Sequence, residues 1–218
     1  MTVRRTSKIV QKKYLQENSN LKILDLGCSN ENYWKEANHY ADIFDYQDFF
    51  KSKNLTFTKI DIGKKLPFRD KQFDYVILSH VLEHVEDIVK FKSEIERVAK
   101  SGYIELPTKL ADNLVFDFVE EKYAHKWWLE FDDSSQTLFY SRKINPIQSF
   151  LSVGSLNKLV NYYEDSLTIQ LYWQENIEIK ERNKYIENKK ISFFDLQRKF
   201  YGYKIRSIKS KIKNLFKV

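Results

Sequence analysis

The strongest constraint on the fold is an apolar run that ends in an acid and a glycine, residues 21–30. Asp25 and Gly27 close this run, and residues 31–39 after it have a composition compatible with a helix. A strand, a tight turn and a helix in this order open an α/β unit of the kind that binds nucleotides. Glycine lets the backbone turn sharply and approach a ligand, and the N–H groups of the next helix would point to the same place.

The glycine loop is incomplete, because Ser29 stands where a second glycine is expected and Asn32 where a third would fall. An ordinary buried strand followed by a turn is therefore an equally good interpretation of this stretch alone. The segments that follow it favour the α/β unit.

Four further segments have the composition of β-strands: residues 41–45, 55–60, 74–79 and 102–106. Residues 74–79 are almost continuously apolar, as expected for a central parallel strand that is buried on both faces. Residues 86–100 show the apolar spacing of an amphipathic helix. This alternation predicts a Rossmann-like, doubly wound and mostly parallel sheet in three α/β/α layers, with an aromatic-rich insertion and a C-terminal basic helix.

Acidic residues stand at or near the ends of three predicted strands: Asp25, Asp45 and Asp61. The carboxyl ends of parallel strands form the ligand-binding edge of such sheets, so these side chains are expected to converge there. Asp45 comes twenty residues after Asp25, a common distance for an acid that binds ribose hydroxyls. An N-cap role for Asp45 is the alternative, and Asp48 is the substitute if the strand register is shifted.

The composition limits the class of protein. With 218 residues, 42% hydrophobic and 31% charged, the chain is expected to form one soluble domain with an appendage. Its single cysteine, Cys28, excludes an internal disulfide and favours a reducing, cytoplasmic compartment. The sequence shows neither a membrane-spanning run nor a signal-peptide pattern, which favours the same location.

We expect three regions: a polar lead-in over residues 1–20, the main domain over residues 21–180, and a basic helical tail over residues 181–218. An aromatic-rich insertion over about residues 109–165 is expected to form the substrate side of the main domain. Residues 137–140 and 167–173 have the composition of strands, and residues 177–179 are expected to pair with the second of them.

Positive charge is concentrated at the end of the chain, where residues 180–218 contain 13 Lys and Arg against three Asp and Glu. The rest of the chain is slightly acidic, so no nucleic-acid partner is predicted. From residue 191 an apolar stripe is surrounded by lysines, which suits the inner face of an anionic membrane or an acidic partner. Packing of this stripe on the chain's own domain is the alternative.

Residues 21–107 resemble the core of the class I S-adenosylmethionine-dependent methyltransferases. The matching segments are residues 23–28, the acid near Asp45, Asp61 before residues 66–68, and residues 73–85. Residues 102–108 followed by residues 125–127 also resemble methyltransferases found with bacterial capsule and surface-glycan genes.

The resemblance implies S-adenosyl-L-methionine as the cofactor. The loop after the first strand would approach its methionine part, Asp45 would bind the ribose, and Asp61 the adenine amino group, with Ile62 packed on the ring. The end of the fourth strand would form the wall beside the methyl group. The complete expected cofactor-binding set is Asp25, Gly27, Cys28, Ser29, Asp45, Asp61, Ile62, Ser79 and His80.

Methyl transfer is an in-line displacement in which the cofactor supplies the reactive carbon and the protein supplies alignment. A sugar hydroxyl is a poor nucleophile, so a base is expected near the methyl group. His125 is the first candidate for this base, Glu105 is the second, and His80 is a candidate for contact with the substrate. His39 and His84 are expected to have structural roles.

Lys126, Trp127 and Arg142 are expected to hold a small anionic or glycosidic acceptor. We therefore predict an O-methyltransferase that acts on a sugar- or phosphate-containing precursor, a phosphoramidate included, in bacterial capsule or surface-polysaccharide biosynthesis. The acidic-aromatic motif with paired prolines that is typical of amino-group methylation is absent after the fourth strand.

Two other interpretations stay open. A methyltransferase-like binding protein without activity would account for the incomplete glycine loop. The pattern His80-x-x-Glu83-His84 also matches an inverted zinc-peptidase motif. That motif needs both histidines on one helix face, whereas His80 directly follows an apolar strand, so no metal site is predicted.

Overall fold

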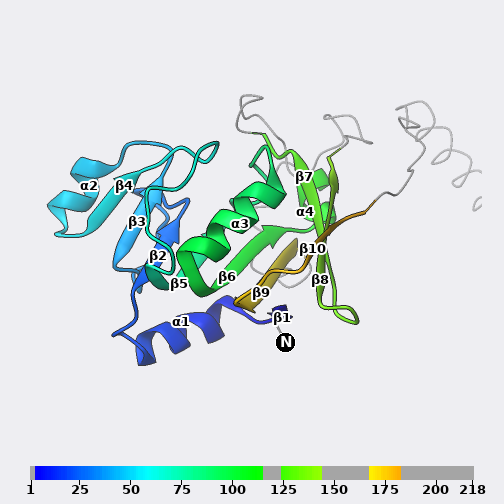
Figure 1. Cartoon of the computed structure of the whole chain (residues 1–218), viewed down its shortest axis with the longest axis horizontal. Coiled ribbons are helices and arrows are strands. Elements are labelled where there is room, and N and C mark those ends of the chain that lie inside the picture. Colours follow the sequence, from blue (N-terminus) through cyan, green and yellow to red (C-terminus); the bar gives the residue numbers. More distant parts are fainter. Residues whose placement is uncertain (1–2, 115–123, 144–166, 183–218) are drawn as a thin grey trace, which may run out of the picture.

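The computed structural model describes residues 3–114, 124–143 and 167–182; the predicted tail helix and part of the predicted insertion lie outside these ranges. Within them, the main sheet has the strand order β1-β9-β6-β5-β2-β3-β4 (Figure 1). Its strands are β1 (Val3–Arg5), β2 (Ile23–Leu26), β3 (His39–Asp42), β4 (Thr56–Lys59), β5 (Phe73–Ser79), β6 (Ala99–Pro107) and β9 (Thr168–Gln174). Neighbours from β6 to β4 are parallel, while β9 runs antiparallel to both β6 and β1.

Helices cover both faces of this sheet. They are α1 (Lys8–Glu17), α2 (Gln47–Ser52), α3 (Ile88–Val98) and, after β6, α4 (Lys109–Leu114). Buried residues of α3 share a core with Leu24 and Leu26, whereas Leu15 of α1 and Phe50 of α2 share a second core with Ile23. Successive residues of a strand point to opposite faces, so the two cores lie on opposite sides of the sheet. The predicted doubly wound, mostly parallel sheet in three layers is confirmed.

The sequence of α3 explains its position on the sheet. Asp87 caps the helix, because its carboxylate accepts a hydrogen bond from the Lys90 N–H at 2.9 Å. The buried residues of the helix recur at intervals of three and four, which places them on one stripe. They are Ile88, Phe91, Ile95 and Val98.

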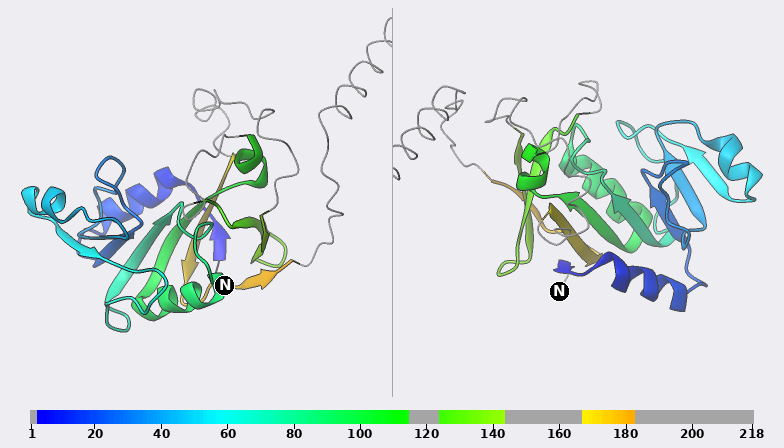
Figure 2. Two further views of the ribbon diagram at one scale, coloured as in Figure 1. Left: turned by 90° about the horizontal axis from the view of Figure 1, so that it is seen from above. Right: turned by 180° about the vertical axis from the view of Figure 1, so that it is seen from behind.

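A second, three-stranded sheet stands at the end of the main sheet (Figure 2). It consists of β7 (Trp127–Asp132), β8 (Thr137–Arg142) and β10 (Ile179–Glu181). β8 pairs with β7 antiparallel and with β10 parallel. The predicted pairing of residues 177–179 with the preceding strand is therefore wrong, and only an isolated bridge joins Gln174 to Asn176.

Residues 31–39 contain no helix, so the predicted helix after the first strand of the unit is wrong. Tyr33 is partly buried and packs edge-on against aromatic rings of α2, and the next residue, Trp34, is buried. Consecutive positions of a helix do not face the same side, so packing both rings inward favours an irregular backbone. His39 begins β3 instead of lying in a helix, and its Nε2 is 2.9 Å from Thr58 Oγ1.

The polar lead-in contributes an edge strand and a helix to the main domain. Val3 in β1 is buried, and Ser7 caps α1 by accepting a hydrogen bond from the Val10 N–H at 3.3 Å. Among the described residues, none of the helices combines the length and apolar character needed to cross a membrane.

Candidate active site

A cavity of about 270 Å³ opens at the carboxyl ends of β2, β3 and β5. A second cavity, of about 780 Å³, adjoins it along the loop after β4 and the start of α3. The two cavities share four lining residues: Ile43, Ile60, Ile62 and His84. This edge is where ligands bind in open α/β sheets, so the two cavities form the candidate site.

Gly27 forms part of the wall of the smaller cavity. Its φ is +88°, and a Cβ on this residue would lie 2.4 Å from Cγ2 of Val81. The Gly27 N–H donates to the carbonyl oxygen of Ala41 at 2.8 Å, which fixes the turn against β3. Glycine is therefore required both by the backbone conformation and by the close approach of the next loop.

Asp42, rather than the predicted Asp45, is the acid that lines the cavity at the end of β3. The strand ends three residues earlier than the sequence suggested. Burial raises the pKa of Asp42 to about 6, against hydrogen bonds from the backbone that lower it. Asp45 is exposed, accepts a hydrogen bond from the Gln47 N–H, and lies 3.8 Å from Lys59 Nζ. Asp45 lies outside the linings of both cavities, so its position does not support the ribose role predicted for it.

Asp25 is buried and lines neither cavity. It accepts a hydrogen bond from the Trp34 N–H at 2.7 Å, and burial raises its pKa to about 7. The expected convergence of three acids on one ligand is therefore wrong for Asp25, which holds the loop after β2 instead.

Cys28 and Ser29 also support this loop from outside the lining of the cavity. Cys28 is buried, with its Sγ 3.7 Å from the Ala41 carbonyl oxygen. The Ser29 hydroxyl accepts a hydrogen bond from the Asn32 N–H at 2.8 Å and so closes a tight turn. The residue that replaces the expected second glycine therefore has a local structural role.

Asp61 and Ile62 follow β4, as expected from the sequence. Ile62 lines both cavities and Asp61 lines the larger one. A hydrogen bond with Lys64, helped by the Gly63 N–H, lowers the pKa of Asp61. The Asp61 side chain is therefore ionised and can accept hydrogen bonds in the larger cavity.

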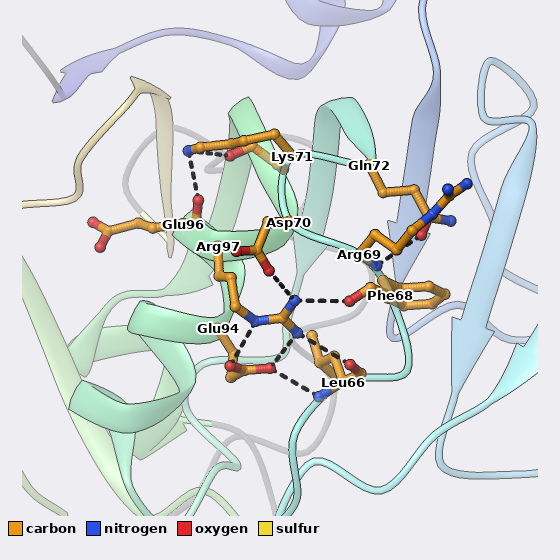
Figure 3. Close-up of polar contacts among 10 residues, drawn as sticks. Leu66, Phe68, Arg69, Asp70, Lys71, Gln72, Glu94, Glu96 and Arg97 are labelled. Atoms are coloured by element: carbon orange, nitrogen blue, oxygen red, sulfur yellow. Dashed lines mark hydrogen bonds and ion pairs between the residues drawn. The ribbon is translucent and has the colours of Figure 1, made fainter.

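Arg97 of α3 holds the loop that continues from Asp61 (Figure 3). Its guanidinium donates to the Phe68 carbonyl oxygen at 2.7 Å and to that of Leu66 at 3.1 Å. Glu94 bonds both the guanidinium, at 2.7 Å, and the Leu66 N–H, at 2.8 Å. The planar guanidinium thus fixes one side of the site to a helix.

His80 lines the smaller cavity and has a φ of +57°. Its Nδ1 lies 3.1 Å from Glu83 Oε1 and its Nε2 lies 3.6 Å from Glu105 Oε1. Burial opposes protonation of the ring, but the hydrogen bonds with these two carboxylates raise the pKa of His80 to about 9. The imidazole is therefore a cation at neutral pH and cannot act as a base there.

Glu105 is buried in β6 among donors. It accepts hydrogen bonds from Tyr103 at 2.5 Å and from Ser79 at 3.2 Å, and pairs with Lys8 at 3.2 Å. Burial raises its pKa, but hydrogen bonds with His80 and Tyr103 outweigh this and lower the pKa to about 2. A carboxylate this acidic is a weak base, so Glu105 does not suit the catalytic role predicted for it.

His125 is held by Asp112 of α4. Its Nδ1 lies 2.5 Å from Asp112 Oδ1, and Asp112 also accepts from Trp128 Nε1 at 2.7 Å and from Lys143 at 3.0 Å. Burial opposes ionisation of Asp112, but its hydrogen bond with His125 lowers its pKa below the ordinary value. The His125 ring meets the His84 ring edge-on with centroids 4.5 Å apart, and His84 lines both cavities. The structure therefore brings His125 beside the site.

The three residues expected to hold the acceptor lie just before β7, at its first residue and at the last residue of β8. Lys126 lines the larger cavity and pairs with Glu86. Trp127 donates from Nε1 to the Val85 carbonyl oxygen at 2.7 Å, and the Arg142 guanidinium lies 5.0 Å from the centre of its ring. Only Lys126 of the three is a lining residue of the two cavities.

Sequence reasoning missed three residues of this site. Asp42 directly follows the buried Tyr40 and Ala41, so its place at the strand end was a usable signal. Arg97 follows Glu94 at helical spacing, which predicts their ion pair but not the bonds to a distant loop. Asp112 lies thirteen residues before His125, and no local pattern links the two.

Residues 24–104 match the protein-family model described as "Methyltransferase domain". This range runs from β2 to β6 and includes Gly27, Asp42 and Asp61 of the candidate site. These residues are therefore similar to a methyltransferase domain, which agrees with the resemblance seen in the sequence. A comparison with curated proteins gave no match.

Several solved structures are similar to parts of this chain. The CurJ carbon methyltransferase is 14% identical with a TM-score of 0.38, covering 46% of this chain and 34% of its own. The MccD protein is 16% identical with a TM-score of 0.42, covering 75% of this chain and 96% of its own. The PH0226 protein from Pyrococcus horikoshii OT3 is 18% identical with a TM-score of 0.38, covering 78% of this chain and 92% of its own.

In four of the matching structures, the CurJ methyltransferase among them, the matched part spans only about a third to a half of the structure's own length. At these TM-scores the likenesses assign neither a substrate nor a mechanism to this chain.

Proposed function

We propose that this protein transfers the methyl group of S-adenosylmethionine to an oxygen of a small acceptor that carries a sugar or a phosphate. One observation supports the proposal most. At the strand edge, the lining of one cavity combines a glycine backbone, a buried acid, an apolar loop and the two histidines His80 and His84.

The glycine, the acid and the apolar loop suit an adenosyl group. Asp42 is the acid we assign to the ribose hydroxyls, because it lines the smaller cavity at the end of β3. Ile60 and Ile62 offer apolar surface to the adenine ring, and Asp61 offers a carboxylate to the adenine amino group. The Gly27 turn would leave room for the methionine part.

The lysines of the larger cavity could pair with an anionic acceptor, although the lining contains equal numbers of lysines and acids. Four lysines line it: Lys59, Lys64, Lys90 and Lys126. The acids in the same lining pair with some of them, as Glu86 does with Lys126 and Asp61 with Lys64. A phosphate could exchange with these surface carboxylates at little cost, since exposed ion pairs contribute about 1 kcal/mol or less.

Transfer to oxygen requires that the acceptor hydroxyl lose its proton, and we assign its activation to His125. Asp112 holds Nδ1 of this imidazole, which leaves Nε2 for the acceptor side. In the displacement the O–C bond forms as the S–C bond breaks, and S-adenosylhomocysteine leaves as a neutral sulfide. The main contribution of the protein to the reaction is to align the acceptor oxygen, the methyl carbon and the sulfur.

Binding of S-adenosylhomocysteine tests the cofactor side. We expect Asp42→Asn to weaken it at least about tenfold, the equivalent of one lost charge-assisted hydrogen bond. The matched control is Asp45→Asn, which removes a nearby aspartate outside the cavity and should leave the affinity unchanged. Absence of binding to the unmodified protein at millimolar ligand would favour the non-catalytic interpretation.

Methyl transfer across a panel of nucleotide-sugars, phosphosugars and phosphoramidates tests the acceptor side. The resemblance of residues 102–108 and 125–127 supports a precursor of a bacterial capsule or surface polysaccharide. We propose the cytoplasm as the location and a membrane surface or an acidic partner for the basic tail. Transfer only to amine or carbon acceptors in the same panel would contradict the proposal.

A further inference from the structure

Glu83, His84 and His125 bring one potential ligand atom each to within 4.8 Å of one another. The first two follow β5, whereas His125 precedes β7, some forty residues later in the chain. The residues after His125 are tied to Glu83, because its carbonyl oxygen accepts from the Lys126 N–H at 2.7 Å. The proximity of the three side chains is therefore fixed by the backbone.

The Glu83 carboxylate gives an independent sign of a ligand. The residue is fully buried, and its Oε1 is bonded by His80. Its Oε2 is buried without a hydrogen-bond partner among the residues that the structure describes. A buried carboxylate oxygen with no partner costs several kcal/mol, so such atoms in folded proteins are usually paired or bound to a cation.

His125 is held in the manner of a metal ligand. Metal-binding histidines commonly donate their second ring N–H to a carboxylate, which sets the tautomer and the ring orientation. Asp112 does this for Nδ1 of His125. The edge-on contact between the rings of His84 and His125 also brings two imidazoles to one point.

From this arrangement we infer that Glu83, His84 and His125 form a binding site for a divalent transition-metal cation, with Asp112 as the carboxylate that orients His125. Two imidazoles and one carboxylate suit ions such as Mn²⁺ and Zn²⁺. Three protein ligands leave coordination positions open for oxygen atoms of another molecule.

The inferred metal site adjoins the cavities that we assign to the cofactor and the acceptor. His84 lines both cavities, so an ion bound by it would lie next to them. A cation there would lower the pKa of a coordinated hydroxyl and orient its oxygen toward the methyl group. The hydroxyl proton passes to solvent, and the oxygen then displaces the sulfide. This step rests on the proposed function. In it, His125 activates the acceptor by binding the metal ion and does not itself remove the proton.

The zinc-peptidase interpretation is different and is not supported. Residues 80–84 do not form a helix, and Nδ1 of His80 is bonded to Glu83 instead of facing a shared ion with His84. The inferred site uses His125 from another segment in place of His80.

Metal binding by the full chain tests the inference directly. The protein is stripped with a chelator and titrated with Mn²⁺, followed by electron paramagnetic resonance, and with Zn²⁺, followed by calorimetry. We expect one ion per chain. Glu83→Gln and His125→Asn should each weaken binding at least about tenfold, and Asp112→Asn about 10- to 100-fold. His39→Gln removes an imidazole that contacts Thr58 and should bind the ions as the unmodified protein does.

Each variant is checked by circular dichroism and by binding of S-adenosylhomocysteine. Glu83 is fully buried, so its variant could unfold; His125 is partly exposed, and its variant decides the question in that case. Binding of neither ion, or unchanged affinity in the folded His125→Asn variant, would overturn the inference.

Methyl-transfer assays separate the inference from the proposed function. Full activity in the stripped enzyme, with loss in His125→Asn, would make His125 a simple base and overturn the metal site alone. Ion binding that depends on His125 in a chain that neither binds S-adenosylhomocysteine nor transfers methyl would support the site and overturn the proposed function.

Discussion

The guanidinium of Arg97 donates a hydrogen bond to the carbonyl oxygen of Phe68 at 2.7 Å, across 29 residues of chain. This bond joins a helix on one face of the sheet to the loop whose first residues line the two cavities of the candidate site. The loop has no regular structure of its own, so its position depends on such bonds.

Replacing Arg97 by glutamine should therefore loosen the Asp61 loop. We expect about 1–3 kcal/mol lower free energy of unfolding and about tenfold weaker binding of S-adenosylhomocysteine, because several charge-assisted hydrogen bonds are lost. Urea denaturation and calorimetry measure the two effects. Arg69→Gln, at an exposed position of the same loop, is the control. Equal stability and equal affinity in both variants would show that the hydrogen bonds of Arg97 do not position the loop.

Alanine variants of two glycines, Gly27 and Gly102, distinguish a loss of stability from a loss of cofactor binding. Alanine at Gly27 would combine a φ of +88° with a Cβ 2.4 Å from Val81, whereas at Gly102 its Cβ would lie 2.3 Å from the Val76 carbonyl oxygen, away from the cavity. Both alanine variants should lose at least about 1–3 kcal/mol of stability. Only Gly27→Ala should abolish cofactor binding in protein that is still folded. A similar loss of binding in Gly102→Ala would show that the effect of Gly27→Ala on binding is not specific to the cavity.

Placing the expected glycine at position 29 should raise neither the stability of the protein nor its affinity for S-adenosylhomocysteine. Ser29→Gly loses the hydroxyl that accepts from the Asn32 N–H, so we expect about 1 kcal/mol lower stability. Affinity for S-adenosylhomocysteine should stay the same or fall. A clear gain in affinity, measured by calorimetry, would mean that serine impairs the loop.

Asp25 makes stability depend on pH in an unusual direction. Burial raises its pKa from 3.8 to about 7. Between pH 4 and pH 7 the unfolded chain has released this proton and the folded chain keeps it, so the contribution of Asp25 to stability falls as pH rises. The full shift corresponds to about 4 kcal/mol at about 1.4 kcal/mol per pH unit.

Asparagine at position 25 keeps an oxygen for the Trp34 N–H and removes the charge. The decrease in unfolding free energy between pH 5 and pH 8 should therefore be smaller in Asp25→Asn, by urea denaturation at both values. Parallel pH profiles of the variant and the unmodified protein would refute this assignment.

The strands of the parallel sheet were predictable because each is a short apolar run bounded by polar residues. β5 and α3 illustrate this, since continuous apolarity and a stripe at helical spacing are local properties. The segment at residues 31–39 was not predictable, because the packing of Tyr33 on α2 and of Trp34 against Tyr103 outweighs local helix propensity.

The site was predictable where it follows strand ends. Gly27 and Ile62 line the cavity as expected, whereas a three-residue error in the end of β3 moved the acid from Asp42 to Asp45. The Asp112–His125 contact and the hydrogen bond from Arg97 to Phe68 join segments that are distant in the chain. Such contacts cannot be predicted from the local pattern of a single sequence.

Because β1 is the outer strand beside β9, the first few residues shield a backbone edge that would otherwise be open to pairing with another chain. The same segment leads to Lys8, whose ammonium group meets Glu105 behind the cavity. A shortened chain that starts after residue 8 would therefore be prone to self-association and would also leave the Glu105 carboxylate with one cation fewer. Expression trials should keep this segment intact and place any affinity tag ahead of it through a flexible spacer.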